Sequence, residues 1–259
     1  MQDQDTGICS FDADSVVLVT GASSGIGAAI ALKLNALGAA VIANGTNVPR
    51  LESVRERARH PDRFHLAPRD LLADIDQLAS WVKELCARHG KLSGLVIAAG
   101  KTETIPFAAY ERARALALFD LLFHVPLEIA KAAVDRRNCL PGRMKIVFIA
   151  AAASIAPNKG QIVYGAAKAA LACAARCMSK ELAPRGICVN CISPGLVRTA
   201  MFDETVALLG EDFLKQEAAR YPLGIGDPED IAGLAAFLLS PAARWMTGQN
   251  LLVDGGRLG

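Results

Sequence analysis

The sequence lacks a strong excess of either charge. Its 28 lysines and arginines and its 26 aspartates and glutamates leave a formal net charge of +2 over 259 residues. Proteins that bind nucleic acid or an anionic membrane surface concentrate positive charge. The charge balance therefore gives no reason to expect either partner.

Long apolar runs are also missing. A membrane-spanning helix needs about 20 consecutive apolar residues, and no run in this sequence reaches that length. The start, MQDQDTGICSFDAD, is acidic and polar, whereas a secretory signal begins with basic residues and continues into an apolar core. We therefore expect a cytoplasmic protein without a membrane-inserted segment.

Metal-binding and redox motifs are scarce. The 7 cysteines are scattered, and the only CxxC, Cys188 to Cys191, lies inside an apolar run that predicts a strand. Side chains three positions apart on a strand point to opposite faces, so this pair is badly placed to chelate or to form a disulfide. The 4 histidines show no ligand spacing. We therefore predict no metal site.

No repeat, low-complexity segment or linker divides the chain. Instead, short apolar runs alternate with longer segments of helical period, which predicts a doubly wound α/β sheet. The runs are mostly apolar on both sides, as is typical of parallel strands covered by helices on each face. They cover residues 15–20, 39–44, 64–68, 95–99, 143–150, 187–193 and 250–254.

The alternation predicts a single domain over residues 15–259, preceded by a flexible extension at 1–14. One long helix is expected around 107–137. Residues 196–226 resemble an insertion and are expected to form a lid over a site. The apolar lid residues, which indicate an apolar substrate unless they pack against the body, include Met201, Phe202 and Leu208.

The first predicted strand runs directly into Thr20-Gly-Ala-Ser-Ser-Gly-Ile-Gly27, and a helical pattern follows. Glycines at such a turn let the backbone approach a ligand, and the helix N-terminus offers free N–H groups to a pyrophosphate. At the first strand-to-helix crossing of an α/β chain, this loop predicts dinucleotide binding.

The spacing TGxxxGxG resembles the short-chain dehydrogenase/reductase family, in the compact form related to β-ketoacyl-carrier-protein reductases. The resemblance extends from about Ser15 to Asp254. It also rests on Tyr164-Gly-Ala-Ala-Lys168, Arg185-Gly-Ile-Cys-Val-Asn190, Pro194-Gly-Leu-Val-Arg-Thr199 and Gly248-Gln-Asn-Leu-Leu-Val-Asp-Gly-Gly256. It implies a Rossmann-type sheet of seven parallel strands in the order 3-2-1-4-5-6-7. It further implies a homotetramer or homodimer, or pairing with a homologous subunit.

The resemblance implies a nicotinamide dinucleotide cofactor. NADP(H) is favoured over NAD(H), because Asn44-Gly-Thr-Asn47 at the end of the second strand has no carboxylate to repel a 2′-phosphate. Arg50 is a possible phosphate partner, although a solvated arginine explains it as well. The residues that match the family's cofactor contacts are Gly21, Ser23, Ser24, Gly25, Ile26, Gly27, Thr46, Asp70, Leu71, Ala99, Gly100, Tyr164, Lys168, Pro194, Gly195, Val197 and Thr199.

Tyr164 and Lys168 occupy the family's acid/base positions, one helical turn apart. A tyrosine of ordinary pKa near 10 is a poor base, and a lysine beside it favours the tyrosinate. The resemblance therefore implies carbonyl/alcohol interconversion of a small-molecule or carrier-bound substrate, with Tyr164 as acid/base and Lys168 as its modulator.

Two catalytic positions depart from the family pattern. Thirteen residues before Tyr164, where the family has a substrate-orienting serine, this chain has Ala151, and the nearest hydroxyl belongs to Ser154. Leu122 stands where the family has an asparagine, and His124 lies on a different side of that helix. Removing one oxyanion donor typically lowers a rate by about 10²–10³.

Three interpretations follow from these departures. The first is a reductase in which another group, such as Ser154, holds the substrate. The second is an enzyme of altered chemistry; enoyl reductases of the wider group lack the serine, but their tyrosine lies seven residues before the lysine, where this chain has Gln161. The third is a catalytically impaired dinucleotide-binding subunit or regulator that pairs with an active homologue.

Overall fold

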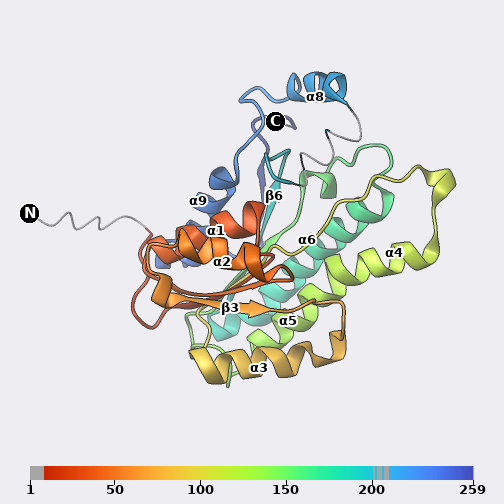
Figure 1. Cartoon of the computed structure of the whole chain (residues 1–259). Coiled ribbons are helices and arrows are strands. Elements are labelled where there is room, and N and C mark those ends of the chain that lie inside the picture. Colours follow the sequence, from red (N-terminus) through yellow and green to blue (C-terminus); the bar gives the residue numbers. More distant parts are fainter. Residues whose placement is uncertain (1–8, 201, 203–205, 207–209, 259) are drawn as a thin grey trace, which may run out of the picture.

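The computed structural model describes residues 9–200, 202, 206 and 210–258, without the side chains of 211–214. Its centre is a seven-stranded sheet in the order β3-β2-β1-β4-β5-β6-β7 (Figure 1). Every neighbouring pair of strands is parallel. The predicted fold and strand order are thereby confirmed. The strands are β1 (Val16–Thr20), β2 (Ala40–Gly45), β3 (Phe64–Pro68), β4 (Gly94–Ile97), β5 (Lys145–Ile149), β6 (Cys188–Pro194) and β7 (Asn250–Val253).

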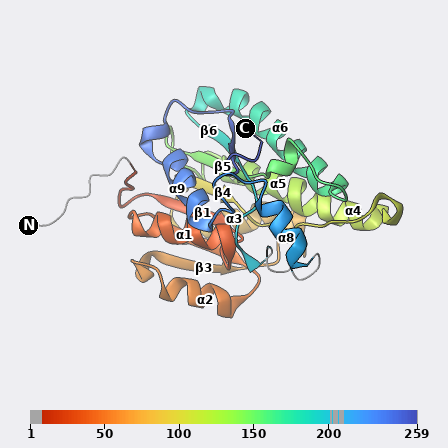
Figure 2. The same ribbon diagram turned by 90° about the horizontal axis from the view of Figure 1, so that it is seen from above.

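Helices cover both faces of the sheet (Figure 2). The side chains of the central strands are therefore buried on both sides. One apolar core lies between the sheet and α1 (Gly25–Ala36), α2 (Val48–Glu56) and α9 (Pro228–Leu239). The other lies between the sheet and α3 (Leu78–His89), α5 (Val125–Ala133) and α6 (Ile162–Leu182). Among the described residues, none of the helices combines the length and the apolar character that crossing a bilayer requires.

The long helix expected around 107–137 runs without a gap from Arg112 to Ala133, but it contains one π-helical turn. A 3-10 turn covers Phe107–Ala109, α4 covers Arg112–Phe119, and a π-helical turn at Asp120–His124 leads into α5. Pro126 accounts for this wider turn, because it has no N–H and its ring crowds the carbonyl four residues earlier, that of Leu122. The predicted helix is therefore present with shorter ends, and Leu122 lies in its π turn.

Parts of the predicted extension and lid lie in the described ranges. From the extension, the Phe11 N–H donates to the carbonyl of Leu37 (3.1 Å), and Asp12 forms an ion pair with Arg143 (2.6 Å). The lid region contains α8 (Glu211–Ala218), which lies at the same edge of the molecule as the C-terminus (Figure 1). Two of the apolar lid residues named above, Met201 and Leu208, lie outside the described residues.

Candidate active site at the carboxyl edge of the sheet

The glycine loop after β1 closes tightly on itself and on the chain after β4. A Cβ atom on Gly27 would stand 2.2 Å from the carbonyl oxygen of Gly21, and one on Gly21 would stand 2.7 Å from the backbone nitrogen of Ala99. The Thr20 hydroxyl oxygen accepts hydrogen bonds from the N–H groups of Ala98 (3.2 Å) and Ala99 (3.1 Å). No side chain larger than hydrogen fits at Gly21 or Gly27, so both glycines are required by packing.

The N-terminus of α1 keeps its N–H groups free of side-chain caps. Ser24 is the N-cap residue, and its extended backbone is not accompanied by a capping hydrogen bond. Gly25 has a positive φ of 54°, and a Cβ there would stand 3.0 Å from Cγ2 of Thr199, so the chain after β6 packs over the helix start. Half-buried Ile26 packs against the core. Uncapped N–H groups beside a glycine turn fit a pyrophosphate.

Two of the three polar residues at the end of β2 have structural partners. The buried amide of Asn44 donates to the carbonyls of Ala67 (3.0 Å) and Arg69 (3.1 Å) and so ties β2 to β3. Asn47 caps α2 by accepting the N–H of Arg50 (2.9 Å). The sequence could not separate these structural amides from groups that meet a ligand.

Ser23 and Thr46 lie at this end of β2 together with the N-terminus of α2. A Cβ on Gly45 would stand 3.0 Å from the Ser23 hydroxyl oxygen, so the glycine loop and the end of β2 touch. Thr46 and Arg50 are exposed. After β3, exposed Asp70 accepts the N–H of Leu72 (2.9 Å), and Leu71 is buried. Hydroxyl and guanidinium donors at a point without a carboxylate suit a phosphate.

The segment after β6 is packed against the chain that follows β7. A Cβ on Gly195 would stand 2.8 Å from Cα of Asp254 and 2.9 Å from a ring carbon of Tyr221. The Gly195 N–H donates to the carbonyl of Val253 (2.8 Å), which holds Pro194 and Gly195 at the sheet edge. Val197 forms an isolated bridge with Gly226. The predicted cofactor residues after β6 thus share one edge with the glycine loop.

Tyr164 and Lys168 lie on α6, and the lysine is anchored at the end of β5. Its ammonium donates to the carbonyl of Ile149 (2.6 Å), and the residue is 6% exposed. Burial lowers the pKa of Lys168 to about 8. Desolvation raises the pKa of Tyr164 to about 12. At neutral pH the phenol is therefore protonated and the lysine is mostly charged.

Leu122 and Lys168 both lie next to Gly100. A Cβ placed on Gly100 would stand 3.0 Å from Cδ2 of Leu122 and 3.8 Å from the ammonium nitrogen of Lys168. Leu122 is 1% exposed, so a methyl group occupies the place where an amide would stand. The ring of His124 packs against Phe119 and Phe123 instead of reaching Lys168.

The alanines after β5 form a stretch without side-chain hydrogen-bond donors. Ala151 and Ala152 are both buried. The hydroxyl oxygen of Ser154 lies 3.4 Å from that of Ser193, which in turn donates to the side-chain oxygen of Asn250 (2.6 Å). Ser154 thus faces β6 through a chain of polar groups. Sequence reasoning did not single out Ser193, and it gave Asn250 no role of its own although that residue lies in the Gly248–Gly256 motif.

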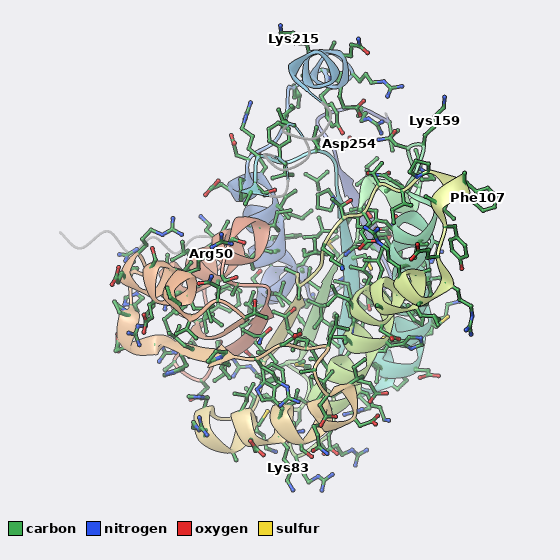
Figure 3. The ribbon with its side chains drawn as sticks, turned by 45° about the vertical axis from the view of Figure 1, so that its right-hand side comes forward. Arg50, Lys83, Phe107, Lys159, Lys215 and Asp254 are labelled. Carbon is green, nitrogen blue, oxygen red and sulfur yellow. The ribbon has the colours of Figure 1, made fainter. Side chains whose placement is uncertain are left out.

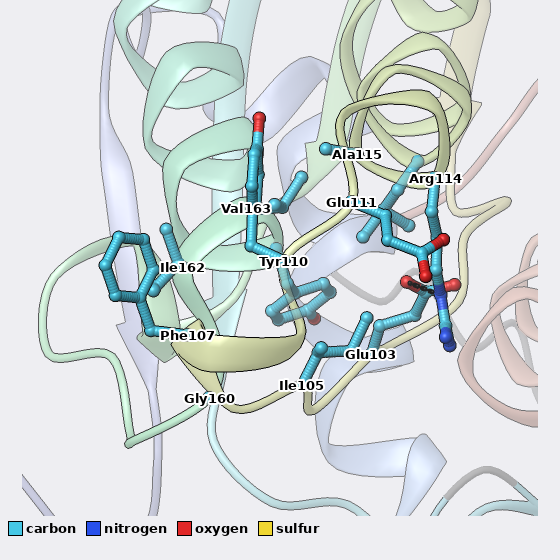
Figure 4. A pocket seen from close by; sticks show the side chains of 12 residues that line it. Glu103, Ile105, Phe107, Tyr110, Glu111, Arg114, Ala115, Gly160, Ile162 and Val163 are labelled. Atoms are coloured by element: carbon cyan, nitrogen blue, oxygen red, sulfur yellow. Dashed lines mark hydrogen bonds and ion pairs between the residues drawn. The ribbon is translucent and has the colours of Figure 1, made fainter.

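A mostly apolar pocket lies between the start of α6 and the 103–118 region (Figure 4). Ile105, Tyr110 and Tyr164 are among the side chains that line it, and an ion pair between Glu103 and Arg114 (3.1 Å) stands at one side. Phe107 at its rim is 75% exposed. Among the described residues, no three His, Cys, Asp or Glu side chains are grouped so that they could hold a metal ion.

The parallel sheet, the glycine loop and the Tyr164–Lys168 pair together define a dinucleotide-binding α/β protein. The family model described as Enoyl-(Acyl carrier protein) reductase matches residues 21–257. The chain belongs to the short-chain dehydrogenase/reductase family, in the compact form that resembles the β-ketoacyl-carrier-protein reductases.

Comparisons with individual proteins agree with this membership. The 3-oxoacyl-[acyl-carrier-protein] reductase of Aggregatibacter actinomycetemcomitans is 33% identical over 249 residues, which cover 93% of this chain and 98% of that protein. A dehydrogenase/reductase from Sinorhizobium meliloti has a TM-score of 0.86 at 30% identity, with both chains covered completely. YwfH, described as an NADPH-dependent reductase involved in bacilysin biosynthesis, has a TM-score of 0.87 at 29% identity, covering 95% of this chain and 98% of YwfH.

Proposed function

We propose that this protein is an NADP(H)-dependent oxidoreductase that interconverts a carbonyl and an alcohol, with Tyr164 as acid/base and Lys168 as its modulator. The observation that carries the proposal is the position of the pair. Lys168 is bound to the end of β5, one turn after Tyr164, at the sheet edge that also carries the glycine loop. The names of several similar proteins, 3-oxoacyl-[acyl-carrier-protein] reductases, support a carbonyl substrate.

The chemistry follows from the protonation states. The bound cofactor supplies or accepts the hydride. In the direction of reduction the substrate oxygen gains negative charge, and protonated Tyr164 gives its proton to that oxygen. The positive charge of Lys168 stabilises the tyrosinate that is left. A phenol whose pKa is raised to about 12 is protonated near neutral pH, so it holds the proton that the direction of reduction requires.

The residues present fit NADP(H). Gly21, Gly25 and Gly27 leave the cradle that a pyrophosphate needs. Ser23 and Thr46, with Arg50 beside them, would hold the 2′-phosphate because no carboxylate stands at the end of β2. The description of YwfH as NADPH-dependent supports this preference. The remaining contacts would come from Asp70, Leu71, Ala99, Gly100, Pro194, Gly195, Val197 and Thr199.

Ser154 is the proposed replacement for the absent substrate-orienting serine. The proton of Ser193 points to Asn250, so in the 3.4 Å contact the Ser154 hydroxyl is the donor. A separation of 3.4 Å is well beyond the usual range of about 2.5–3.0 Å for this kind of hydrogen bond. The Ser154 proton is therefore weakly held and free to turn toward a substrate oxygen.

The substrate proposed is a small-molecule or carrier-bound carbonyl compound, reduced in the cytoplasm. The description of the matching family model points to enoyl reduction instead. Gln161, at the position seven residues before Lys168 where enoyl reductases have their tyrosine, argues against that chemistry. A carbonyl substrate also gives Tyr164 an oxygen to protonate.

We also propose that the chain works as a homodimer or homotetramer. Apolar side chains stand exposed on α4, on the turn before it and at the start of α6, and a second copy would cover them. Phe107 is 75%, Leu116 is 48% and Ile162 is 50% exposed. A homologous subunit is the alternative occupant of the same face.

A second candidate function is a dinucleotide-binding subunit with little activity of its own. Leu122 and Ala151 favour it, because both positions that would touch the proton relay or the substrate carry buried apolar side chains. The two candidates differ in what Tyr164 does. In an inert subunit Tyr164 does not transfer its proton to a substrate.

The test is titration with NADPH and NADH, followed by a screen of carbonyl substrates with wild type and Tyr164→Phe. Turnover with NADPH that drops by about 10²-fold or more in Tyr164→Phe supports the reductase. Unchanged turnover in Tyr164→Phe refutes the assigned role. Tight NADPH binding without turnover, together with capture of an active homologue, favours the impaired subunit.

A further inference from the structure

One guanidinium near the C-terminus joins two segments that flank the proposed site. Nη2 of Arg257 lies 3.0 Å from a carboxylate oxygen of Glu217 on α8 and donates to the side-chain oxygen of Asn158 (3.1 Å). Its guanidinium carbon stands 5.6 Å from the ring centroid of Tyr221. The side chains of Arg257 and Glu217 are each only 9% exposed. A single side chain thus bridges the chain after β7, the α8 region and the loop before α6.

Both bridged segments lead directly to predicted site residues. Asn158 lies in the loop between Ser154 and Tyr164. The hydroxyl oxygen of Tyr221 accepts the N–H of Leu196 (3.1 Å), and its ring packs on Gly195 in the cofactor segment. Figure 3 shows Asp254, Lys159 and Lys215, from the same three segments, at one edge of the molecule, far from Lys83 on α3.

The turn after β7 sets the direction of Arg257. The carboxylate of Asp254 accepts the N–H groups of Gly256 (3.1 Å) and Leu258 (2.9 Å). The N–H of Arg257 donates to the Asp254 carbonyl (3.2 Å). The tail is therefore folded back by its own hydrogen bonds, and Arg257 is directed by a rigid turn.

A second arginine, Arg220, can be compared with Arg257, because both form an ion pair with Glu217. Glu217 also pairs with Arg220 (3.0 Å), whose side chain is 60% exposed. No contact of Arg220 with Asn158 or Tyr221 is among those described. The Nε atom of Arg257 is buried and has no partner in the described part of the chain.

We propose that Arg257 is a positioning residue for the reaction, holding the Glu217–Tyr221 region and the Asn158 loop together beside the proposed site. It acts through Asn158 and through Tyr221, which supports the Gly195–Leu196 segment. The proposal rests on the proposed function, because it concerns the substrate that these segments would enclose. Lysine cannot replace this arginine in full, since an ammonium lacks the planar guanidinium that stacks on the Tyr221 ring while Nη2 reaches Glu217 and Asn158.

The experiment compares Arg257→Met and Arg257→Lys with Arg220→Met as the matched control. Steady-state kinetics with NADPH and the best carbonyl substrate should show KM raised about tenfold or more in both Arg257 variants, with kcat changed much less. The pH profile of kcat should keep its midpoint, because Tyr164 and Lys168 are untouched. Arg220→Met should resemble wild type. Equal KM values for Arg257→Met and Arg220→Met would overturn the proposal.

A second measurement separates this proposal from the proposed function. Limited proteolysis with an unspecific protease, at a temperature where all variants are folded, should cut residues 215–226 severalfold faster in Arg257→Met than in wild type or Arg220→Met. If the wild type binds NADPH but turns over nothing, the reductase fails while this measurement still decides the role of Arg257. An unchanged cleavage rate in Arg257→Met would refute it.

Discussion

The Lys168 ammonium donates a 2.6 Å hydrogen bond to the carbonyl oxygen of Ile149, at the point where β5 ends. The backbone of the sheet therefore holds the lysine in place. Leu122, the residue that the sequence aligns with the family's asparagine, has no polar atom that could accept a hydrogen bond from Lys168. The end of β5 thus gives the Lys168 ammonium an acceptor that does not depend on residue 122.

The pH dependence of reduction should reflect Lys168 before Tyr164. Burial lowers the pKa of Lys168 to about 8, and desolvation raises that of Tyr164 to about 12. We expect kcat/KM for the NADPH-dependent reduction to fall as pH rises through about 8, because the lysine loses its charge while the phenol is still protonated. A rate that rises steadily between pH 8 and pH 10 would contradict this order of titration.

Lys168 should also make folding stability depend on pH. Its pKa in the folded protein, about 8, lies below the ordinary value of 10.5, so the unfolded chain binds more protons between these values. Stability contributed by this residue therefore rises with pH across that window. Denaturant unfolding of wild type and Lys168→Met from pH 7.5 to 10 should show the difference between them shrinking or reversing as the buried charge is lost. A pH-independent difference would refute the shifted pKa.

Ala151→Ser should increase turnover if the family's substrate pose is still available. A hydroxyl at this position would supply the missing donor, and one oxyanion donor is worth about 10²–10³ in rate. Because Ser154 already supplies part of this interaction in our proposal, we expect a gain of about tenfold in kcat.

Ala152→Ser is the matched control for this substitution. The two alanines are adjacent and buried to a similar extent, at 7% and 6% exposure. Only Ala151→Ser should raise the rate. Equal gains in both variants would indicate a general effect of a buried hydroxyl, and no gain in either would show that the substrate binds differently.

The cofactor preference should reverse when a carboxylate is placed at the end of β2. Thr46→Asp would repel a 2′-phosphate and accept a ribose hydroxyl, so the Kd for NADPH should rise at least about tenfold while that for NADH falls, a difference of about 1.4 kcal/mol per tenfold. Fluorescence titration of both cofactors measures this.

Asn47→Asp adds the same charge one residue away and retains the α2 cap, since an aspartate oxygen can also accept the Arg50 N–H. It should weaken NADPH binding much less than Thr46→Asp does. If both variants weaken it equally, the effect is one of general charge, and Thr46 does not contact the phosphate.

The sequence by itself determined the features that depend on neighbouring residues. Short apolar runs placed all seven strands, because burial on both faces of a parallel sheet demands such runs. Gly21 and Gly27 marked the loop, because no Cβ fits there. The four-residue spacing of Tyr164 and Lys168 set both on one helix, since 3.6 residues make a turn.

Tertiary structure decided what depends on residues distant in the chain. Nothing near Asn44 indicated that its amide would tie β2 to β3, and nothing near Ser154 indicated Ser193 as its partner. Arg257 forms an ion pair with Glu217, which lies 40 positions earlier in the chain. It also donates a hydrogen bond to Asn158, which lies 99 positions earlier. The partner of a polar group depends on which strands and loops meet at the sheet edge, and that geometry exists only after the chain has folded.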